Sequence, residues 1–283
     1  MYSILVFGWD IQFGLANILN FSYGAIWGIE AYFSALLALK LDLNLLLGLL
    51  LAGFFSVLVG LPPIIASLRL KHIAYIAIAT LAYGEILRLI VVEWDELTRG
   101  VRSLWGIPPF PTIHIGNLEI NFYGFDRSPF YYLSLIIFLV VFLSFIKLHR
   151  SKWYYTLKTI KTDDILAETL GIDVIRSRLL CSIIALFLAG IAGSLYAHYI
   201  QVLTPSMMEV STSFELFLMD LLGGAGTVLG PIFGSFILIF VLEALRVTEE
   251  IRFIIFGGMI ICLIIFLPQG LSALLKYLKR LLK

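Results

Sequence analysis

Apolar runs of eighteen or more residues recur along the whole of this sequence. Only helices and closed barrels can cross a lipid bilayer, because each backbone N–H and C=O must find its partner within the protein. A helix crosses with about twenty apolar residues, whereas a barrel strand shows roughly ten residues of alternating polarity. These runs do not alternate. The sequence therefore predicts an all-α protein, a polytopic transmembrane helical bundle.

Composition and charge support a membrane protein over a soluble one. Hydrophobic residues make up 60% of the chain and charged residues 14%, whereas soluble domains are about a quarter charged. The net charge of +1 lacks the basic footprint of a nucleic-acid-binding protein, so we expect no nucleic-acid partner. Cys181 and Cys262 both lie in apolar runs and are expected to be buried thiols rather than a disulfide or metal ligands.

We expect about eight to nine spans in a single transmembrane domain over residues 1–283. To within several residues, the candidate spans are 2–19, 22–39, 43–68, 73–92, 129–148, 179–200, 214–222, 228–245 and 251–267. The first contains Asp10 and Gln12, which leaves open whether it crosses completely. The third contains Pro62-Pro63, which is expected to kink or end a helix.

Basic residues predict the orientation of a membrane protein, because they are enriched in cytoplasmic segments. Residues 147–178 carry seven and the C-terminal tail four, whereas the loop 93–128 carries three against five acidic residues. We therefore expect a multi-pass protein of the cell membrane with residues 149–178 and the C-terminus cytoplasmic and 93–128 external. An even number of crossings must then lie between these two cytoplasmic segments. Counting 214–222 as a separate, short crossing gives four crossings and meets this condition.

The segment 214–222 is too short to cross as an ordinary helix. Nine residues cover about 13 Å, less than half of the hydrocarbon core. It ends in the glycine-rich run 223–226, which predicts a broken or re-entrant helix of the kind found in transporters. Residues 24–28 and 226–230 share a Gly-x-x-x-Gly pattern, and each is expected to open an apolar helix, a weak sign of an internal repeat.

Ionisable residues within spans are functional candidates, because charge is costly in lipid. Asp220 precedes the glycine run and either lines a pathway or caps the broken backbone. Glu85 and Arg88 are three residues apart and are expected to form a structural ion pair. The candidate translocation path consists of Glu30, Asp220, Gly223, Gly224 and Gly226.

The polar passage 156–178 predicts a short capped helix. Thr162 is the expected N-cap, Asp163 and Asp164 fall in the first turn, and Gly171 suits the position after the C-terminus. Ile165, Leu166, Thr169 and Leu170 form an apolar stripe with Glu168 off it. Because so short a helix is marginal alone, it needs a surface to lie against. Periodicity alone leaves two interpretations open, a partner-docking helix and a solvated loop between two spans.

No catalytic chemistry is visible in the sequence. The run 223–230 lacks the Gly-Lys-Ser/Thr of a phosphate-binding loop and follows no strand. No Ser/His/Asp set is evident, and the four histidines are scattered without metal-ligand spacing. We therefore expect no catalytic residue, no metal site and no cofactor, and hence a protein that does not convert energy itself.

An ordered set of motifs resembles the permease subunits of branched-chain amino-acid ATP-binding-cassette (ABC) importers, specifically the LivM type. The motifs lie at residues 20–24 with 28–32, 75–88, 97–100 leading to 106–108, 160–171, 221–231, and 268–271. The resemblance covers nearly the whole chain. Each motif alone is weak, but their order is typical of this family.

The resemblance implies a pore-forming permease subunit without an ATPase site. Its expected partners are a second, similar permease, two ATP-binding subunits that bind the ATP, an external substrate-binding protein and the lipid bilayer. The polar passage is then similar to the family's coupling helix, which docks on the ATPase. The residues implied in this ATPase coupling are Thr162, Asp163, Asp164, Ile165, Glu168, Leu170 and Gly171.

The implied solute is a branched-chain amino acid or a similar small polar solute. Relatives in this family also carry urea and short amides. Two departures from the family's usual sequence therefore leave the identity of the solute open. Glu30 stands where the family usually has glycine, and residues 98–103 replace the family's usual glycine-rich external motif.

Two rival functions remain on the residues alone. A stand-alone, ion-gradient-driven secondary transporter is favoured by Asp220, Glu30 and the broken helix. A membrane enzyme acting on lipid would need a nucleophile or a metal set at the interface, and the sequence shows neither.

Overall fold

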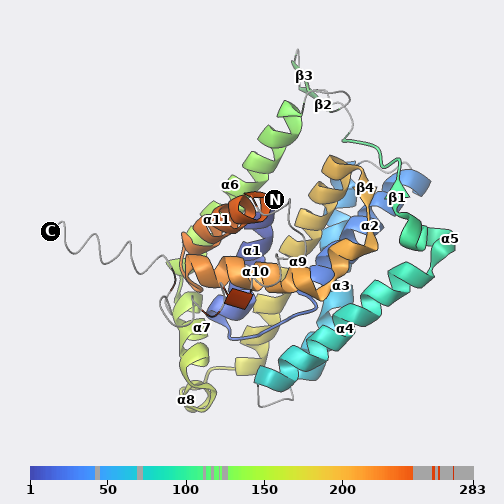
Figure 1. Ribbon diagram of the computed structural model, residues 1–283. Coiled ribbons are helices and arrows are strands. Elements are labelled where there is room, and N and C mark those ends of the chain that lie inside the picture. The colour runs from blue at the N-terminus through green and yellow to red at the C-terminus, as the bar shows by residue number, and fades with distance from the viewer. Residues whose placement is uncertain are drawn as a thin grey trace.

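Long helices form most of the molecule (Figure 1). The computed structural model describes residues 1–41, 45–68, 73–110, 113–115, 118–120, 122, 127–244, 257–258, 261 and 270. The predicted span 251–267 and the C-terminal tail lie outside the described residues, apart from the four positions just named.

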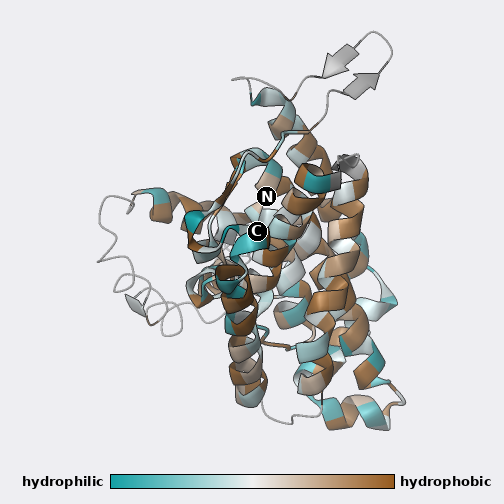
Figure 2. Ribbon diagram, turned by 90° about the vertical axis from the view of Figure 1, so that its right-hand side faces the viewer, coloured by the Kyte–Doolittle hydropathy of each residue, from teal (hydrophilic) through white to brown (hydrophobic). Residues whose placement is uncertain are grey.

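Five helices of nineteen residues or more build the frame: α2 (Tyr23–Leu41), α3 (Leu45–Ser67), α4 (Ile73–Glu93), α6 (Ser128–His149) and α9 (Val174–Ile200). Within the described residues, α4, α6, α9 and α3 from Leu47 onward are long and apolar enough to cross a membrane. Hydrophobic residues predominate along the upright helices (Figure 2). The predicted all-α membrane bundle is thus confirmed.

The N-terminal segment lies inside the bundle. Helix α1 (Tyr2–Asp10) continues into a π-helical turn, η1 (Ile11–Leu15), and every residue from Ile4 to Asp10 is buried. Helix α1 packs against α6, α9, α10 and α11. The helical part of the predicted span 2–19 therefore ends at Leu15, and its fourteen residues cover about 21 Å, too little to cross alone. A helix that is apolar all round belongs in such an interior position.

Helix α9 packs closely against α2 and α3 through small residues. A Cβ added at Gly190 would lie 2.6 Å from the carbonyl oxygen of Ala52, and one at Gly193 would lie 2.6 Å from that of Trp27. The Ser56 hydroxyl also donates to the carbonyl of Leu186 at 2.6 Å. Such close backbone approach is typical of helix contacts within membranes.

Helix α3 contains Pro62 and Pro63 and continues to Ser67, so the prolines do not end the helix. Pro63 has no N–H to donate to the carbonyl of Val59. The Tyr83 hydroxyl of α4 donates to this carbonyl instead, at 2.7 Å. A neighbouring side chain thus satisfies the freed backbone group, as membrane helices with proline require.

Short elements occupy the two ends of the molecule. The segment between α4 and α6 contains α5 (Asp95–Thr98), the 3-10 turn η2 (Gly100–Arg102) and three strands: β1 (Leu104–Trp105), β2 (Ile113–Ile115) and β3 (Leu118–Ile120). Strand β1 pairs antiparallel with β4 (Val202–Leu203), and β2 with β3. We call this the strand end. The α8 end, opposite it in Figure 1, is formed by α7 (Lys152–Thr162) and α8 (Asp164–Thr169).

After β4 the chain forms the 3-10 turn η3 (Pro205–Met208), α10 (Val210–Gly223) and α11 (Gly230–Ala244). The predicted helix 214–222 is therefore too short, because the polar residues 211–213 also adopt helical structure. The predicted glycine break is confirmed: α10 ends at Gly223, and Gly224 has φ +105°. Gly24 lies in the first turn of α2, as expected, whereas Gly226 lies four residues before α11. The expectation that residues 226–230 open a helix was therefore wrong, because Gly226 belongs to the loop of the glycine break, and the internal repeat stays a prediction.

Candidate functional site

Helix α8 begins at Asp164, and its N-cap is Asp163 rather than Thr162. The Asp163 carboxylate accepts the backbone N–H groups of Ile165 at 2.9 Å and Leu166 at 3.2 Å, which makes it the N-cap. The prediction of Thr162 as N-cap was wrong, because Thr162 is the last residue of α7 and its hydroxyl donates to the carbonyl of Lys158 at 2.9 Å. Asp164 lies in the first turn, as predicted.

The C-terminus of α8 is closed by a Schellman motif. Gly171 has φ +78°, its N–H donates to the carbonyl of Glu168 at 2.9 Å, and the N–H of Ile172 donates to that of Ala167 at 3.0 Å. These two bonds satisfy carbonyls that the helix leaves unpaired. The predicted position of Gly171 is confirmed.

The apolar side chains of α8 face outward. Ile165, Leu166 and Leu170 are 74%, 51% and 66% exposed, whereas Ala167 is buried. An ion pair fixes the helix to α9, because the Arg178 guanidinium lies 2.9 Å from the Asp164 carboxylate. The exposed apolar stripe is thus held in a fixed orientation, as expected for a protein-binding surface. Glu168 is also exposed.

A cavity of about 610 Å³ lies behind this helix. Its lining includes Asn17, Ile76, Lys161, Asp164, Glu168 and Arg178. The residues predicted for coupling therefore border both an outer surface and an inner space at the α8 end.

The glycine break lies against α1 and η1. The Asp10 carboxylate accepts the backbone N–H of Gly226, and the carboxyl groups of Asp10 and Asp220 lie side by side. Both side chains are fully buried. Two carboxyl groups and a glycine loop thus meet where α10 ends. The sequence marks Asp10 as an ionisable residue in a span, but nothing local shows that it contacts residues 220 and 226.

Two side chains, one from the end of α6 and one from α7, reach this junction. The His149 Nε2 atom at the end of α6 lies 3.3 Å from the carbonyl oxygen of Gly226. Lys161 on α7 donates from Nζ to the carbonyl of Gly14 at 2.7 Å. Direct contacts therefore join the end of α6 to the break between α10 and α11, and the end of α7 to η1 beside this break.

Close packing explains the glycines at the break. A Cβ at Gly230 would lie 2.5 Å from the carbonyl oxygen of Gly224, and one at Gly226 would lie 2.8 Å from that of Gly14. Gly226 also has φ +77°, a region that favours glycine. The structure thus brings Asp220, Gly223, Gly224 and Gly226 together.

Glu30 lies apart from the glycine break, one turn before a cluster of polar side chains. It is fully buried on α2, where a Cβ at Gly193 of α9 would lie 3.1 Å from its Cβ. One turn further along α2, the Ser34 hydroxyl lies 2.7 Å from that of Ser194 and 3.1 Å from His198 Nε2. The predicted path residues are therefore divided between the glycine break and the interface of α2 with α9.

The pair predicted on α4 also forms in the structure. Arg88 Nε lies 3.0 Å from both carboxylate oxygens of Glu85, which confirms the expected ion pair on α4. Among the residues that the structure describes, no group of three or more His, Cys, Asp or Glu side chains could hold a metal ion.

Comparison with known proteins gives consistent matches. A family profile described as "Branched-chain amino acid transport system / permease component" matches residues 1–264. The chain is 30% identical to the high-affinity branched-chain amino acid transport system permease protein LivM of Salmonella typhimurium, over 96% of this chain and 67% of that protein. The corresponding protein of Escherichia coli is 29% identical with the same coverage.

A second kind of permease also matches. The chain is 27% identical to a probable branched-chain amino acid transport permease protein LivH of Methanocaldococcus jannaschii, over 99% of this chain and 91% of that protein. No solved structure matches the chain.

Proposed function

The chain belongs to the family of permease components of branched-chain amino acid transport systems, and we propose that it is the membrane-spanning permease subunit of an ABC importer. The proposed solute is a branched-chain amino acid or a similar small polar solute. Because the relatives include permeases named LivM and LivH, a second, similar permease is the proposed neighbour in the membrane. Two ATP-binding subunits supply the energy, and an external binding protein delivers the solute.

In the proposed orientation the α8 end is cytoplasmic and the strand end external. The basic residues from 147 to 178 surround α7 and α8, whereas the acidic residues between 93 and 98 lie toward the strand end. This distribution follows the enrichment of lysine and arginine in cytoplasmic segments. The ATP-binding subunits would then meet α8, and the binding protein would meet the strand end.

The observation that carries the proposal is the exposed apolar stripe of α8. A helix of six residues is too short to be stable alone, yet it is capped at both ends and presents Ile165, Leu166 and Leu170 to the outside. Burying each such side chain contributes about 1.5–3 kcal/mol. A groove on the ATP-binding subunit would receive this stripe.

Movement of α8 has a contact route into the membrane region. Helix α7, which precedes α8, is bonded through Lys161 to Gly14 of η1. Asp10, directly before η1, accepts the N–H of Gly226 in the loop before α11. Closure of the ATP-binding subunits would shift α10 and α11 along this route. Solute access would alternate as a shift between two packed states, each favoured by a different ligand.

One observation favours a second candidate function. The buried carboxyl pair of Asp10 and Asp220 resembles the ionisable groups of proton- or sodium-driven transporters. A stand-alone secondary transporter would use this pair as its ion site, and would need no ATP-binding partner.

Purification of the tagged native protein in a mild detergent separates the two functions. We expect two ATP-binding subunits and a second permease to co-purify, and the reconstituted complex to take up solute only with ATP on the α8 side. If the chain purifies alone and transports solute in vesicles until the ion gradient collapses, the importer proposal is wrong and the secondary transporter is supported.

A further inference from the structure

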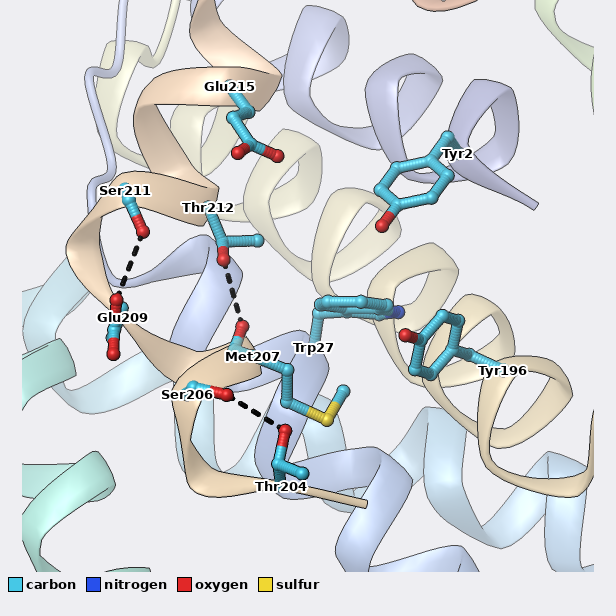
Figure 3. Close-up of a pocket in the computed structure, with 10 residues that line it drawn as sticks. All are labelled: Tyr2, Trp27, Tyr196, Thr204, Ser206, Met207, Glu209, Ser211, Thr212 and Glu215. Atoms are coloured by element: carbon cyan, nitrogen blue, oxygen red, sulfur yellow. Dashed lines mark hydrogen bonds between the residues drawn. The ribbon is translucent and has the colours of Figure 1, made fainter. Parts of the chain in front are cut away.

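Ten described residues line a polar pocket (Figure 3). It has a volume of about 580 Å³ and lies between the start of α1, α2, the end of α9, η3 and the first turns of α10. Tyr196 in its wall lies twenty-two residues after Val174, where α9 begins beside α8. This separation corresponds to about 33 Å along the helix, so the pocket belongs to the strand end.

Three aromatic rings from three helices form one wall. The ring centroids of Trp27 and Tyr196 are 4.8 Å apart in an edge-to-face arrangement, and those of Tyr2 and Trp27 are 6.0 Å apart. Trp27 is only 3% exposed, so core packing fixes its ring. A rigid π surface of this kind attracts cations.

A carboxylate lies across the pocket from Trp27. Glu215 extends from the second turn of α10 with its oxygen atoms directed into the pocket (Figure 3), although its side chain is only 9% exposed. Glu209 adds a second carboxylate to the lining and lies near enough to Arg88 to interact with it electrostatically. The pocket therefore presents carboxylate oxygens, the groups that accept hydrogen bonds from an ammonium group.

Hydroxyl groups line the opposite side. Thr204 Oγ1 and Ser206 Oγ are 2.8 Å apart, so one hydroxyl donates a hydrogen bond to the other. The proton of the accepting hydroxyl stays available. The Thr212 hydroxyl donates to the carbonyl of Met207 at 3.0 Å. The hydroxyl that accepts the bond between Thr204 and Ser206 can donate its own proton to a polar group of a ligand.

So polar a cavity does not suit contact with lipid, because charged and hydroxyl groups in a membrane protein face water or other protein. Its volume falls in the range of small-molecule sites, about 300–1,000 Å³. Both points favour a water-filled chamber on a solute pathway.

We propose that this pocket binds the ammonium group of the solute, between the ring of Trp27 and the carboxylate of Glu215, before the solute crosses. The inference rests on the proposed importer function and narrows it. It selects amino acids and related amines, and it excludes neutral solutes such as urea and short amides. Charge-assisted hydrogen bonds and cation–π contacts are the interactions that distinguish these classes.

The test measures binding to the purified complex of permeases and ATP-binding subunits in lipid nanodiscs, without the external binding protein. Radiolabelled L-leucine is the probe, and two analogues compete with it: 3-methylbutylamine, which keeps only the amine, and 4-methylpentanoate, which keeps only the carboxylate. We expect the amine to compete and the carboxylate not to compete. Equal competition by the two, or no saturable leucine binding, would overturn the proposal.

Variants locate the site. Glu215→Gln is expected to weaken leucine binding at least about tenfold, because one charge-assisted contact is lost. Trp27→Phe is expected to weaken leucine binding less, because phenylalanine still attracts cations, although more weakly than tryptophan does. Glu96→Gln removes an exposed carboxylate on α5, outside the pocket, and should bind as the unchanged protein does. Unchanged binding by Glu215→Gln would show that the site lies elsewhere.

Assembly separates failure of this inference from failure of the proposed function. If Glu215→Gln still co-purifies with both ATP-binding subunits and the complex hydrolyses ATP normally, the variant is folded. Loss of leucine binding by that complex then shows that leucine binds in this pocket. If that complex takes up leucine normally, only the pocket proposal fails. If no ATP-binding subunit co-purifies with the unchanged protein, the importer function itself fails.

Discussion

The Lys161 side chain of α7 donates a hydrogen bond of 2.7 Å to the backbone carbonyl of Gly14, 147 residues earlier in the chain. This bond joins the short helices of the α8 end to the π-helical turn that follows α1. Four residues before Gly14, Asp10 accepts the N–H of Gly226. A series of contacts therefore runs from the proposed ATPase-docking helix to the glycine break.

Replacement of Lys161 tests this route. We expect Lys161→Met to leave assembly and ATP hydrolysis intact but to lower the solute transported per ATP about tenfold, because hydrogen bonds to charged groups contribute about 1.5–3 kcal/mol. The measurement is uptake and ATP hydrolysis in the same proteoliposomes. Lys158→Met is the matched control, since Lys158 is exposed on the same helix. A normal ratio in Lys161→Met would exclude the route.

The exposed stripe of α8 predicts a loss of partner binding. Ile165→Ser with Leu170→Ser should weaken co-purification of the ATP-binding subunits by roughly a hundredfold or more, because each side chain contributes about 1.5–3 kcal/mol when buried. The affinity of the purified subunits gives the readout. Val101→Ser is the control, because Val101 is 80% exposed but lies at the strand end. Full affinity in the double variant would rule out this stripe as the docking surface.

Charge reversal next to the stripe predicts loss of transport. Glu168→Lys should abolish uptake while leaving membrane insertion and expression unchanged, because Glu168 is exposed and a lysine would meet a surface suited to a carboxylate. Uptake in whole cells, scored against the amount of protein in the membrane, measures this effect. A well-expressed Glu168→Lys variant with normal uptake would count against the coupling role.

The left-handed backbone at Gly171 predicts a graded series. Gly171→Val should destabilise the end of α8 by about 1–3 kcal/mol, since a branched side chain is strained at φ +78°. Gly171→Asn should cost less, because asparagine tolerates this region. Proteolysis of the α8 segment in the purified complex reports its local stability. Equal protection in the two variants would show that the glycine conformation does not hold the helix end.

The bond from Tyr83 to Val59 predicts a stability effect within the membrane region. Tyr83→Phe leaves the carbonyl opposite Pro63 without this donor and should cost about 1–3 kcal/mol. Thermal unfolding in detergent should show a lower midpoint. Tyr132→Phe, at an exposed tyrosine of α6, should leave the midpoint unchanged. Equal midpoints for the two variants would mean that the bond contributes nothing.

Contiguous features of the sequence determined much of this protein. Hydropathy over about twenty residues predicts the long helices, and the glycine run predicts the break after α10. Local capping chemistry placed both ends of α8 to within one residue, with Asp163 rather than Thr162 as the N-cap. Such signals act between residues close in sequence, so they can be recognised without the fold.

Only the tertiary structure decided which distant residues meet. The contacts of Asp10 with Gly226 and Asp220, the Tyr83 bond that lets α3 continue past its prolines, and the pocket between Trp27 and Glu215 all join separate helices. The burial of α1 could not be predicted from the sequence either, because an apolar helix has the same composition whether lipid or protein surrounds it. Hydropathy records how apolar a segment is, whereas close packing of helices sets which of its side chains touch.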